Sequence, residues 1–507
     1  MSYYVTTPIY YVNGEPHLGH VYTTVAADVL ARHMRQRGED VFFLTGTDEH
    51  GEPIAQAAER EGVTPRELAD RHAERFKAVA ARVGASNDFF IRTSDPEHEQ
   101  VVAEIVERLK ASGHVYAGTY EGWYCPRCAD FKTDAELVDA DRCPIHLIEL
   151  EREHEDNWFF RLSAFQEPLE RLYADRPDWV LPESRRNEAL AFVEGGLRDF
   201  SLSRARISWG VPIPWDPEQV VYVWVDALLN YYSALRYARP GEDLTGRFWP
   251  ASLHVIAKDI LKFHAVFWPA LLMAAELEPP QRIFIHGYLL MDEHKMSKSL
   301  GNVLDPFLVM DLYGTDALRY YLLREVSFGQ DGSISPEGFE RRYTSELANE
   351  YGNLASRTLA MIGRYRDGVV PDADVPAGLA ADFEGLAGTV AQQLDRVEVS
   401  AALDEVWQRV RRLNRFVTDE EPWQLAKDPA AAARLDQVLY ALAEGLRVTS
   451  VLLHPWMPAS VERLLAALGR EDRGLGDARF GAVAGGARIG ELGQLFPKVE
   501  APQPSQA

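Results

Sequence analysis

Cysteine is scarce in this chain, which has only three among 507 residues, all between Cys125 and Cys143. An odd number of cysteines in one short window does not form a disulfide framework, and it is typical of a reducing compartment. Long apolar runs are also missing, since the longest, residues 263–275, is too short to span a bilayer. The N-terminus lacks the charged and apolar regions of a secretory signal. We therefore expect a cytoplasmic protein.

Positive charge is also in short supply. The 53 Lys and Arg against 77 Asp and Glu give a formal net charge of −24. Proteins that coat nucleic acids without selectivity bind phosphates through clustered Lys and Arg, so the composition argues against that class. The net charge remains compatible with a nucleic-acid partner that docks on a local basic face. The rest of the acidic surface would then repel the nucleic acid in any incorrect orientation.

The N-terminal part alternates strand and helix patterns. Residues 2–12, SYYVTTPIYYV, are rich in β-branched and aromatic types and predict a buried strand. Residues 17–38 predict a helix, residues 41–46 a second strand, and residues 47–61 the opening of another helix. This alternation predicts an α/β fold with a parallel sheet, in which nucleotide chemistry lies at the carboxyl ends of the strands.

The pattern changes later in the chain. Residues 114–214 predict an insertion between two halves of the sheet, after which the rhythm resumes in apolar runs expected to open with strands, at residues 220–235, 253–272 and 282–291. From residue 345 helical periodicity predicts an antiparallel bundle. Its apolar positions are Leu403, Val406, Trp407, Val410, Leu413 and Val417, and again Leu435, Val438, Leu439, Leu442 and Leu446.

Two short motifs that follow predicted strands are candidates for phosphate binding. In HLGH, Gly19 opens a helix whose first amides are unpaired, and His17 and His20 can donate to phosphate oxygens. In KMSKSLGN, residues 295–302, Lys295 and Lys298 can stabilise charge that builds on a triphosphate when its α-phosphorus is attacked. Surface histidines or a solvated basic turn would explain either motif alone, whereas both at strand ends predict one nucleotide site.

The cysteines belong to a second pattern, CPRC followed by CPIH. Two residues separate the ligands within each pair and fourteen separate the pairs, which is typical of a zinc site. Four protein ligands leave no open position for water or substrate, so we expect one structural zinc ion rather than a catalytic one. The ligands are Cys125, Cys128, Cys143 and His146.

Other side chains allow two interpretations. Asp48 and Asp226 lie where the carboxyl edge of the sheet is expected, and a carboxylate there must be solvated or paired. Neighbouring side chains are by spacing alone best explained as core packing: Trp224, Tyr231, Ile260 and His264. A basic run before Trp423 is by default a solvated helix face, with phosphate binding and base stacking as the alternative. It comprises Arg409, Arg411, Arg412 and Arg415.

With these motifs in order, the chain resembles the methionyl-tRNA synthetases of class I that carry a single zinc knuckle. The resemblance runs over nearly the whole chain, through TTPIYYVNGEPHLGH, TGTDEHGEPI, the two zinc pairs, VWVDALLNYY, IAKDILKFHAVFWPAL, FIHGYLLMDEHKMSKSLGN, TDALRYYLLRE, NLASR and EEPWQLAK. It implies activation of methionine by ATP to methionyl-adenylate, then transfer of methionine to the terminal adenosine of tRNA(Met).

The resemblance also implies residue roles. ATP is expected on His17, Gly19, His20, Lys258 and Asp259, with magnesium, and with Lys295 and Lys298 on its phosphates. Asp48 is expected to pair with the ammonium group of methionine. The thioether pocket is expected to comprise Pro8, Ile9, Tyr11, Trp224, Ala227, Leu228, Tyr231, Ile260 and His264, whose aromatic rings suit a polarizable sulfur atom. The CAU anticodon is expected on Asn353, Arg357, Pro422 and Trp423.

We accordingly expect an α/β, Rossmann-type catalytic domain, a zinc-binding insertion and an all-α domain. The segments are 1–113 for the first catalytic half, 114–214 for the insertion, 215–290 for the second half, 291–344 for the KMSKS loop and stem-contact region, 345–495 for the anticodon-binding helix bundle, and 496–507 for a disordered tail. No oligonucleotide-binding dimerisation module follows the bundle, so we expect a monomer.

The sequence departs from the family pattern in places. Ala257 stands where many relatives have Gly, and Leu228 and Leu229 replace a version that contains Pro. Two alternatives are a related synthetase and a non-catalytic tRNA-binding scaffold. TTPIYY lacks the zinc-ligating Cys of cysteinyl enzymes, and the chain has no room for the editing insertion of the isoleucyl, valyl and leucyl enzymes. Intact HLGH and KMSKS argue against a scaffold.

Overall fold

The computed structural model describes residues 2–125, 130–132, 134–144, 147–291 and 305–498. The chain forms two compact units. The first comprises Met1–Ala27, Val41–Ala81 and Asn87–His286, and the second comprises Asp28–Asp40, Arg82–Ser86 and Gly287–Ala507. We call them the first and the second unit.

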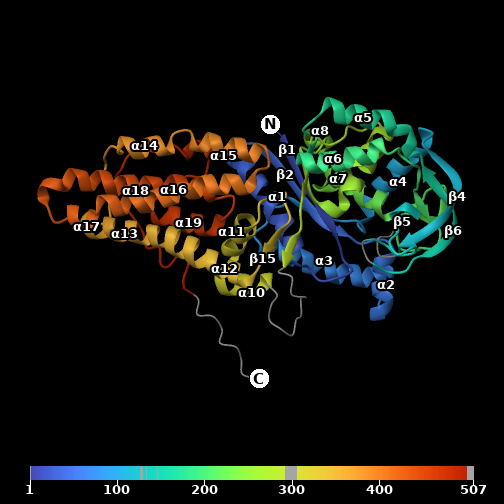
Figure 1. The fold of residues 1–507 in the computed structure, drawn as a ribbon, viewed down its shortest axis with the longest axis horizontal. Coiled ribbons are helices and arrows are strands. Elements are labelled where there is room, and N and C mark those ends of the chain that lie inside the picture. Colours follow the sequence, from blue (N-terminus) through green and yellow to red (C-terminus); the bar gives the residue numbers. More distant parts are fainter. Residues whose placement is uncertain (1, 126–129, 133, 145–146, 292–304, 499–507) are drawn as a thin grey trace, which may run out of the picture. The chain divides into compact units, whose positions relative to one another are not determined.

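A six-stranded sheet forms the centre of the first unit (Figure 1). Its strands, in spatial order, are β3 (Phe89–Arg92), β2 (Asp40–Asp48), β1 (Ser2–Tyr11), β12 (Leu253–Ala257), β13 (Ile283–His286) and β7 (Val180–Leu181). The pairings of β2 with β3, β1 with β12, β12 with β13 and β13 with β7 are parallel, so the predicted α/β parallel sheet is confirmed. The chain proceeds from β1 through β2 to β3 on one side and places β12 on the other. The strand order therefore reverses between β1 and β12, where α/β sheets of this kind bind ligands.

Helices connect and cover these strands. They are α1 (Leu18–Gln36), α2 (Glu52–Glu61), α3 (Pro65–Arg82), α4 (Pro96–Ala111), α7 (Val223–Tyr237) and α9 (Trp268–Ala274). In α7 twelve positions are buried, which leaves almost no polar stripe. A helix that is apolar on nearly every side is one that lies inside the core.

One prediction in this region is wrong. Residues 220–235 were expected to open with a strand of the parallel sheet, but β11 (Asp216–Val221) pairs with β9 (Ser203–Arg204) and β10 (Pro212–Ile213) in a separate antiparallel sheet. The apolar run that follows forms α7. Periodicity cannot distinguish a fully buried strand from a fully buried helix, because neither shows a polar face.

The segment predicted as an insertion contains a four-stranded antiparallel sheet. Its order is β5 (Asp130–Lys132), β4 (Val115–Cys125), β6 (Glu151–Phe160) and β8 (Phe200–Ser201). Two helices follow β6, α5 (Gln166–Asp175) and α6 (Glu183–Glu194). Between these helices the short strand β7 pairs with β13, so this stretch of chain also supplies an edge of the parallel sheet.

The C-terminal part of the second unit, from Gly287 on, contains a short parallel pair, β14 (Leu289–Met291) and β15 (Gly332–Ile334), and is mainly helical. Its helices include α10 (Pro306–Tyr313), α11 (Thr315–Glu325), α12 (Pro336–Arg342), the π-helix η5 (Tyr343–Gly352), α13 (Asn353–Tyr365), α14 (Ala377–Phe383), α15 (Leu386–Asp395), α16 (Val399–Glu420), α17 (Pro422–Leu425), α18 (Ala432–Leu453) and α19 (Pro458–Ala467). Every apolar position predicted for the two long helices α16 and α18 is buried. None of the helices that the structure describes is long and apolar enough to cross a membrane.

Candidate active site

The HLGH motif lies between the end of β1 and the first turn of α1. The rings of His17 and His20 stack with centroids 3.7 Å apart. The amide of His17 donates to Nδ1 of His20 over 3.2 Å, and the amide of Gly19 donates to Nδ1 of His17 over 3.1 Å. A ring nitrogen that accepts a hydrogen bond carries no proton, so the proton of each neutral ring lies on Nε2.

Burial has its larger effect on the ring of His20, since His17 is partly open to solvent. Burial lowers the pKa of His20 to about 3, an effect to which the neighbouring His17 adds, and it also lowers the pKa of His17. His20 is held between Tyr10, at 4.6 Å between ring centroids, and Phe76, at 5.1 Å. The motif therefore presents two positioned Nε2–H donors at neutral pH, which suits an anionic oxygen acceptor.

Asp48 ends β2 and is the carboxylate with unmet hydrogen-bonding capacity at this edge of the sheet. Its residue is 2% exposed, and its Oδ1 has no hydrogen-bond partner among the described residues. Burial raises the pKa of Asp48 well above its usual range, and the carboxylates of Asp226 and Glu49 raise it further. A buried carboxylate in this state gains most from a cation that bonds its bare oxygen.

Aromatic side chains from three segments meet beside this edge. Trp224 of α7 stacks on Phe263 with ring centroids 3.8 Å apart, and Tyr11 of β1 lies edge-on to Trp224 at 6.0 Å. The hydrophobic cluster that includes Leu228 and Tyr231 also packs against partly buried side chains of the predicted pocket. These are Ile9, Tyr11, Trp224 and Ile260. Pro8 of β1 and Ala227 of α7 are buried.

The hydroxyl of Tyr231 has a defined direction. Nδ1 of His264 lies 3.0 Å from the carbonyl of Ile260, which can only accept, so this nitrogen carries the ring proton. Nε2 of His264 must then accept from the Tyr231 hydroxyl at 2.7 Å. Burial lowers the pKa of His264 to about 4, which keeps the ring neutral. The proton of the Tyr231 hydroxyl is thus directed toward His264.

Lys258 and Asp259 follow directly after β12, in the short helical turn Lys258–Ile260. Because β12 is the neighbour of β1, this turn belongs to the same switch point as HLGH. Ala257 has φ −85° and ψ 160°, an extended conformation that any residue adopts. The replacement of Gly by Ala at this position therefore needs no unusual backbone.

In the second unit, two of the predicted anticodon residues are brought together. The guanidinium of Arg357 lies 5.8 Å from the ring centroid of Trp423. Asn353 and Arg357 are exposed on α13, whereas Pro422 is buried and Trp423 is half-buried. A cation over an accessible indole gives a polar and flat surface of the kind that single-stranded bases use.

The chain shows a close likeness to known proteins over its whole length. The model of a family described as tRNA synthetases class I (M) matches residues 3–152 and 135–359. A methionine–tRNA ligase of Caldanaerobacter subterraneus subsp. tengcongensis is 44% identical over 505 residues, which is 98% of this chain and 79% of that protein. The chain belongs to the class I methionyl-tRNA synthetases.

Further similar proteins support the same family. The methionine–tRNA ligase of Streptomyces coelicolor is 45% identical over 522 residues, covering 98% of this synthetase and 97% of that protein. A solved structure, Mycobacterium tuberculosis methionyl-tRNA synthetase in complex with methionyl-adenylate, matches with a TM-score of 0.93 and 41% identity, covering 98% of this chain and 100% of that chain. The apo form of the same protein matches with a TM-score of 0.87 at 38% identity.

Some predicted site residues lie outside the described residues. They are Lys295 and Lys298 of KMSKS, and Cys128 and His146 of the zinc pattern. The other two predicted zinc ligands of this synthetase, Cys125 and Cys143, are both buried and share a small cluster with Leu150. The amide of Cys143 donates to the carbonyl of Ile148 over 3.0 Å, and the amide of Leu147 donates to the carbonyl of Cys143 over 2.9 Å.

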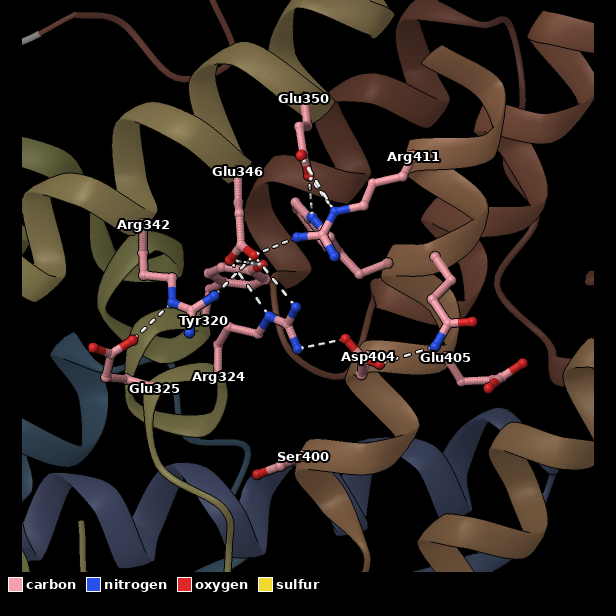
Figure 2. Close-up of polar contacts among 12 residues, drawn as sticks. Tyr320, Arg324, Glu325, Arg342, Glu346, Glu350, Ser400, Asp404, Glu405 and Arg411 are labelled. Carbon is pink, nitrogen blue, oxygen red and sulfur yellow. Dashed lines mark hydrogen bonds and ion pairs between the residues drawn. The ribbon is translucent and has the colours of Figure 1, made fainter. Parts of the chain in front are cut away.

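Three of the four arginines of the basic run on α16 form ion pairs within the second unit. Arg409 pairs with Glu405 at 2.7 Å, and Arg412 pairs with Asp382 at 2.6 Å. Arg411 reaches both Glu346, at 2.8 Å, and Glu350, at 3.1 Å (Figure 2). These ion pairs favour the structural reading of the three arginines over a phosphate-binding one.

Two charged clusters of this synthetase could not be found from the sequence. In the second unit, Figure 2 shows the buried carboxylate of Glu346 facing Tyr320, Arg324, Arg342 and Arg411. In the first unit, Asp226 bonds two histidines, His50 and His98, at 2.7 and 2.8 Å. The His in TDEHG and the Asp in VWVDA were visible in the sequence, but no pattern joins residues so far apart.

Proposed function

We infer that this synthetase is a methionine–tRNA ligase, which uses ATP to activate methionine and then esterifies tRNA(Met). The observation that carries this inference is the 44% and 45% identity to methionine–tRNA ligases over nearly the whole chain. The match to a methionyl-tRNA synthetase that holds methionyl-adenylate supports it.

The reaction has two steps. A carboxylate oxygen of methionine attacks the α-phosphorus of ATP, the bond to the β-phosphate oxygen breaks, and pyrophosphate leaves. A hydroxyl of the terminal adenosine of tRNA(Met) then attacks the methionyl carbonyl carbon, and AMP leaves. Negative charge builds on phosphoryl oxygens in the first step, so positioned donors that bind it there lower the barrier.

ATP is proposed to bind at the switch point between β1 and β12. His17, Gly19 and His20 are supported by the two Nε2–H donors at the start of α1, and Lys258 and Asp259 by their place after β12. Lys295 and Lys298 are proposed for the phosphates on the strength of the KMSKS motif. The nucleotide is proposed to carry Mg²⁺, which neutralises phosphate charge.

Methionine is proposed to bind between β1 and α7, with its ammonium group on Asp48. The bare Oδ1 of Asp48 supports this role, since an ammonium N–H would satisfy it. The side chain is proposed to enter the apolar cluster, where the Tyr231 hydroxyl is held in place by its hydrogen bond to His264. The remaining pocket residues are Pro8, Ile9, Tyr11, Trp224, Ala227, Leu228 and Ile260.

We also propose one structural zinc ion, held by Cys125, Cys128, Cys143 and His146. The burial of Cys125 and Cys143 in a cluster too small to be stable by itself supports a metal that holds the segment together. Bound there, zinc cross-links the two halves of the knuckle and supplies no catalytic chemistry. Metal analysis of the purified chain is expected to give one zinc per chain, and an absence of zinc in folded, active protein would remove this assignment.

The anticodon is proposed to bind in the helical part of the second unit, on Asn353, Arg357, Pro422 and Trp423. The approach of Arg357 to Trp423 supports this. A monomer and a cytoplasmic location are further proposals. A sedimentation mass twice that of the chain would contradict the monomer.

The KMSKS assignment is tested by Lys295→Ala. Loss of one cation that binds the transition state more strongly than the ground state is expected to slow adenylate formation about 10²- to 10³-fold. Methionine binding should remain, which equilibrium dialysis measures. Unchanged ATP–pyrophosphate exchange in this variant would refute the role of the loop.

A further inference from the structure

A hydrogen-bonded chain of titratable residues lies in the first unit and takes no part in the steps above. Nδ1 of His50, which follows β2, bonds Oδ2 of Asp226 in α7 over 2.7 Å. The other carboxylate oxygen bonds Nε2 of His98 in α4 over 2.8 Å, and Nδ1 of His98 bonds the hydroxyl of Ser233 over 2.6 Å. The side chains of His50, His98 and Asp226 are at most 2% exposed.

The turn that carries Asp48 is fixed on both sides by side chains. Before it, the hydroxyl of Thr47 donates to the carboxylate of Glu49 over 2.6 Å, and Arg92 binds the same carboxylate with two bonds of 2.8 Å. After it, His50 is anchored by Asp226. Asp48 thus lies between Glu49 and Thr47, which bond each other, and His50, which bonds Asp226. Its own Oδ1 has no hydrogen-bond partner among the described residues.

The charges around His50 come from several elements. Asp226 faces it from α7 and Glu99 faces it from α4, with Nε2 of His50 3.7 Å from the Glu99 carboxylate. Glu49 approaches from the same turn, and the ring of Trp209 packs edge-on at 5.1 Å. Burial opposes the protonated form of His50, but Asp226, Glu99 and Glu49 together raise its pKa.

Asp226 in turn links this chain to Asp48. Burial alone would raise the pKa of Asp226, but His50 and His98 outweigh it and bring that pKa to about 2. Asp226 is therefore an anion at neutral pH. That anion is the first of the two carboxylates that oppose ionisation of Asp48. The positive charge of protonated His50 offsets the negative charge of Asp226. The two residues therefore shift the pKa of Asp48 in opposite directions.

We propose that His50 and Asp226 are positioning residues for methionine: they fix the turn that carries Asp48 and set the charge under which Asp48 receives the ammonium group. This inference rests on the proposed role of Asp48. The part of the substrate concerned is the α-ammonium group.

The test is the pH profile of the KM for methionine in ATP–pyrophosphate exchange, with the full chain. In His50→Gln the hydrogen-bonding capacity remains but the offsetting charge is lost, so the acidic limb should move to higher pH and the KM at pH 7 should rise roughly tenfold, with kcat within about threefold. In Asp226→Asn the opposing anion is removed, so the acidic limb should move to lower pH. The double variant should lie between the two.

Controls separate the outcomes. His72→Gln replaces another buried histidine of the first unit, one that forms no ion pair in the described part of the chain, and it should leave the profile in place. Asp48→Asn should raise the KM for methionine at every pH. If Asp48→Asn leaves the KM unchanged, the role of Asp48 fails and this inference fails with it. If Asp48→Asn raises the KM but His50→Gln leaves the acidic limb where it is, or both variants move it in one direction, only the present inference is overturned. His50→Gln alone decides this if Asp226→Asn does not fold.

Discussion

The absence of a side chain at Gly19 leaves space for the ring of His17. A Cβ built on Gly19 would lie 3.0 Å from Cε1 and 3.1 Å from Nδ1 of the His17 ring. The same approach lets the Gly19 amide bond Nδ1, which fixes the proton on Nε2. Glycine thus determines both the place and the hydrogen-bonding direction of a proposed ATP ligand.

Gly19→Ala is therefore expected to displace the His17 ring and slow adenylate formation about 10- to 100-fold, because a misplaced donor no longer meets the charge that develops on phosphate. ATP–pyrophosphate exchange with varied ATP measures this. The matched control is Gly14→Ala, since a Cβ there would meet nothing within 4 Å. Equal rates for both variants would contradict the assignment of HLGH.

At this scale the sequence predicted which residue types lie at the strand ends, but not their electrostatic state. HLGH can be recognised in the sequence because Gly19 precedes a predicted helix. The ionised state of Asp226 depends on its bonds to His50 and His98, and His98 in turn bonds Ser233, although these residues lie far apart in the sequence. Pairing of this kind follows from the tertiary fold, so no local pattern contains it.

Among the helices of the second unit, the carboxylate of Glu346 joins η5 to α11, α12 and α16. Tyr320 donates to it over 2.7 Å, and Arg324, Arg342 and Arg411 surround it (Figure 2). Burial would raise the pKa of Glu346, but the Tyr320 hydroxyl and the arginines outweigh burial and lower it. The carboxylate is therefore ionised and stabilises the folded state through these partners.

Glu346→Gln should lower the free energy of unfolding by about 1.5–3 kcal/mol, because it removes the buried negative charge that three arginines share, although each arginine keeps a second carboxylate partner. Urea unfolding measures this. The loss should be full above about pH 5 and should shrink as the pH falls from there through the lowered pKa of folded Glu346, because the native carboxylate then takes up a proton. Asp404→Asn is the control, because its side chain is 40% exposed and its pair with Arg324 should contribute under about 1 kcal/mol.

Element prediction succeeded where one face of an element is polar. The spacing of Leu403, Val406 and Val410 predicted α16 because charged residues fill its other side. The same method failed at α7, which is buried on almost every side. The spacing of apolar residues identifies an element only where one of its faces is exposed to water and therefore polar.

For the molecule as a whole, the residues proposed to bind methionine belong to the first unit, whereas those proposed to bind the anticodon belong to the second. Trp423→Ala should therefore reduce kcat/KM for tRNA(Met) by roughly 5- to 150-fold, the loss expected for one stacked base, and leave methionine-dependent exchange normal. Aminoacylation and exchange measured on the same preparation check this. Impaired exchange would instead make Trp423 part of the core that maintains the fold.

The net charge of −24 belongs to this scale as well. Three arginines of α16 are already paired with carboxylates, whereas Arg357 lies beside Trp423 on the proposed anticodon surface. Discrimination is thus expected to come from single-stranded bases rather than from general attraction to phosphate.

The most direct test of the central claim is amino-acid-dependent ATP–pyrophosphate exchange with the purified chain, comparing methionine with the other amino acids. The account predicts strong exchange with methionine and exchange with the others lower by orders of magnitude, because the proposed partner of the ammonium group, Asp48, suits any amino acid, whereas the proposed aromatic pocket around Trp224 and Tyr231 suits the thioether chain. Exchange that is absent with methionine, or equally strong with leucine or cysteine, would contradict it.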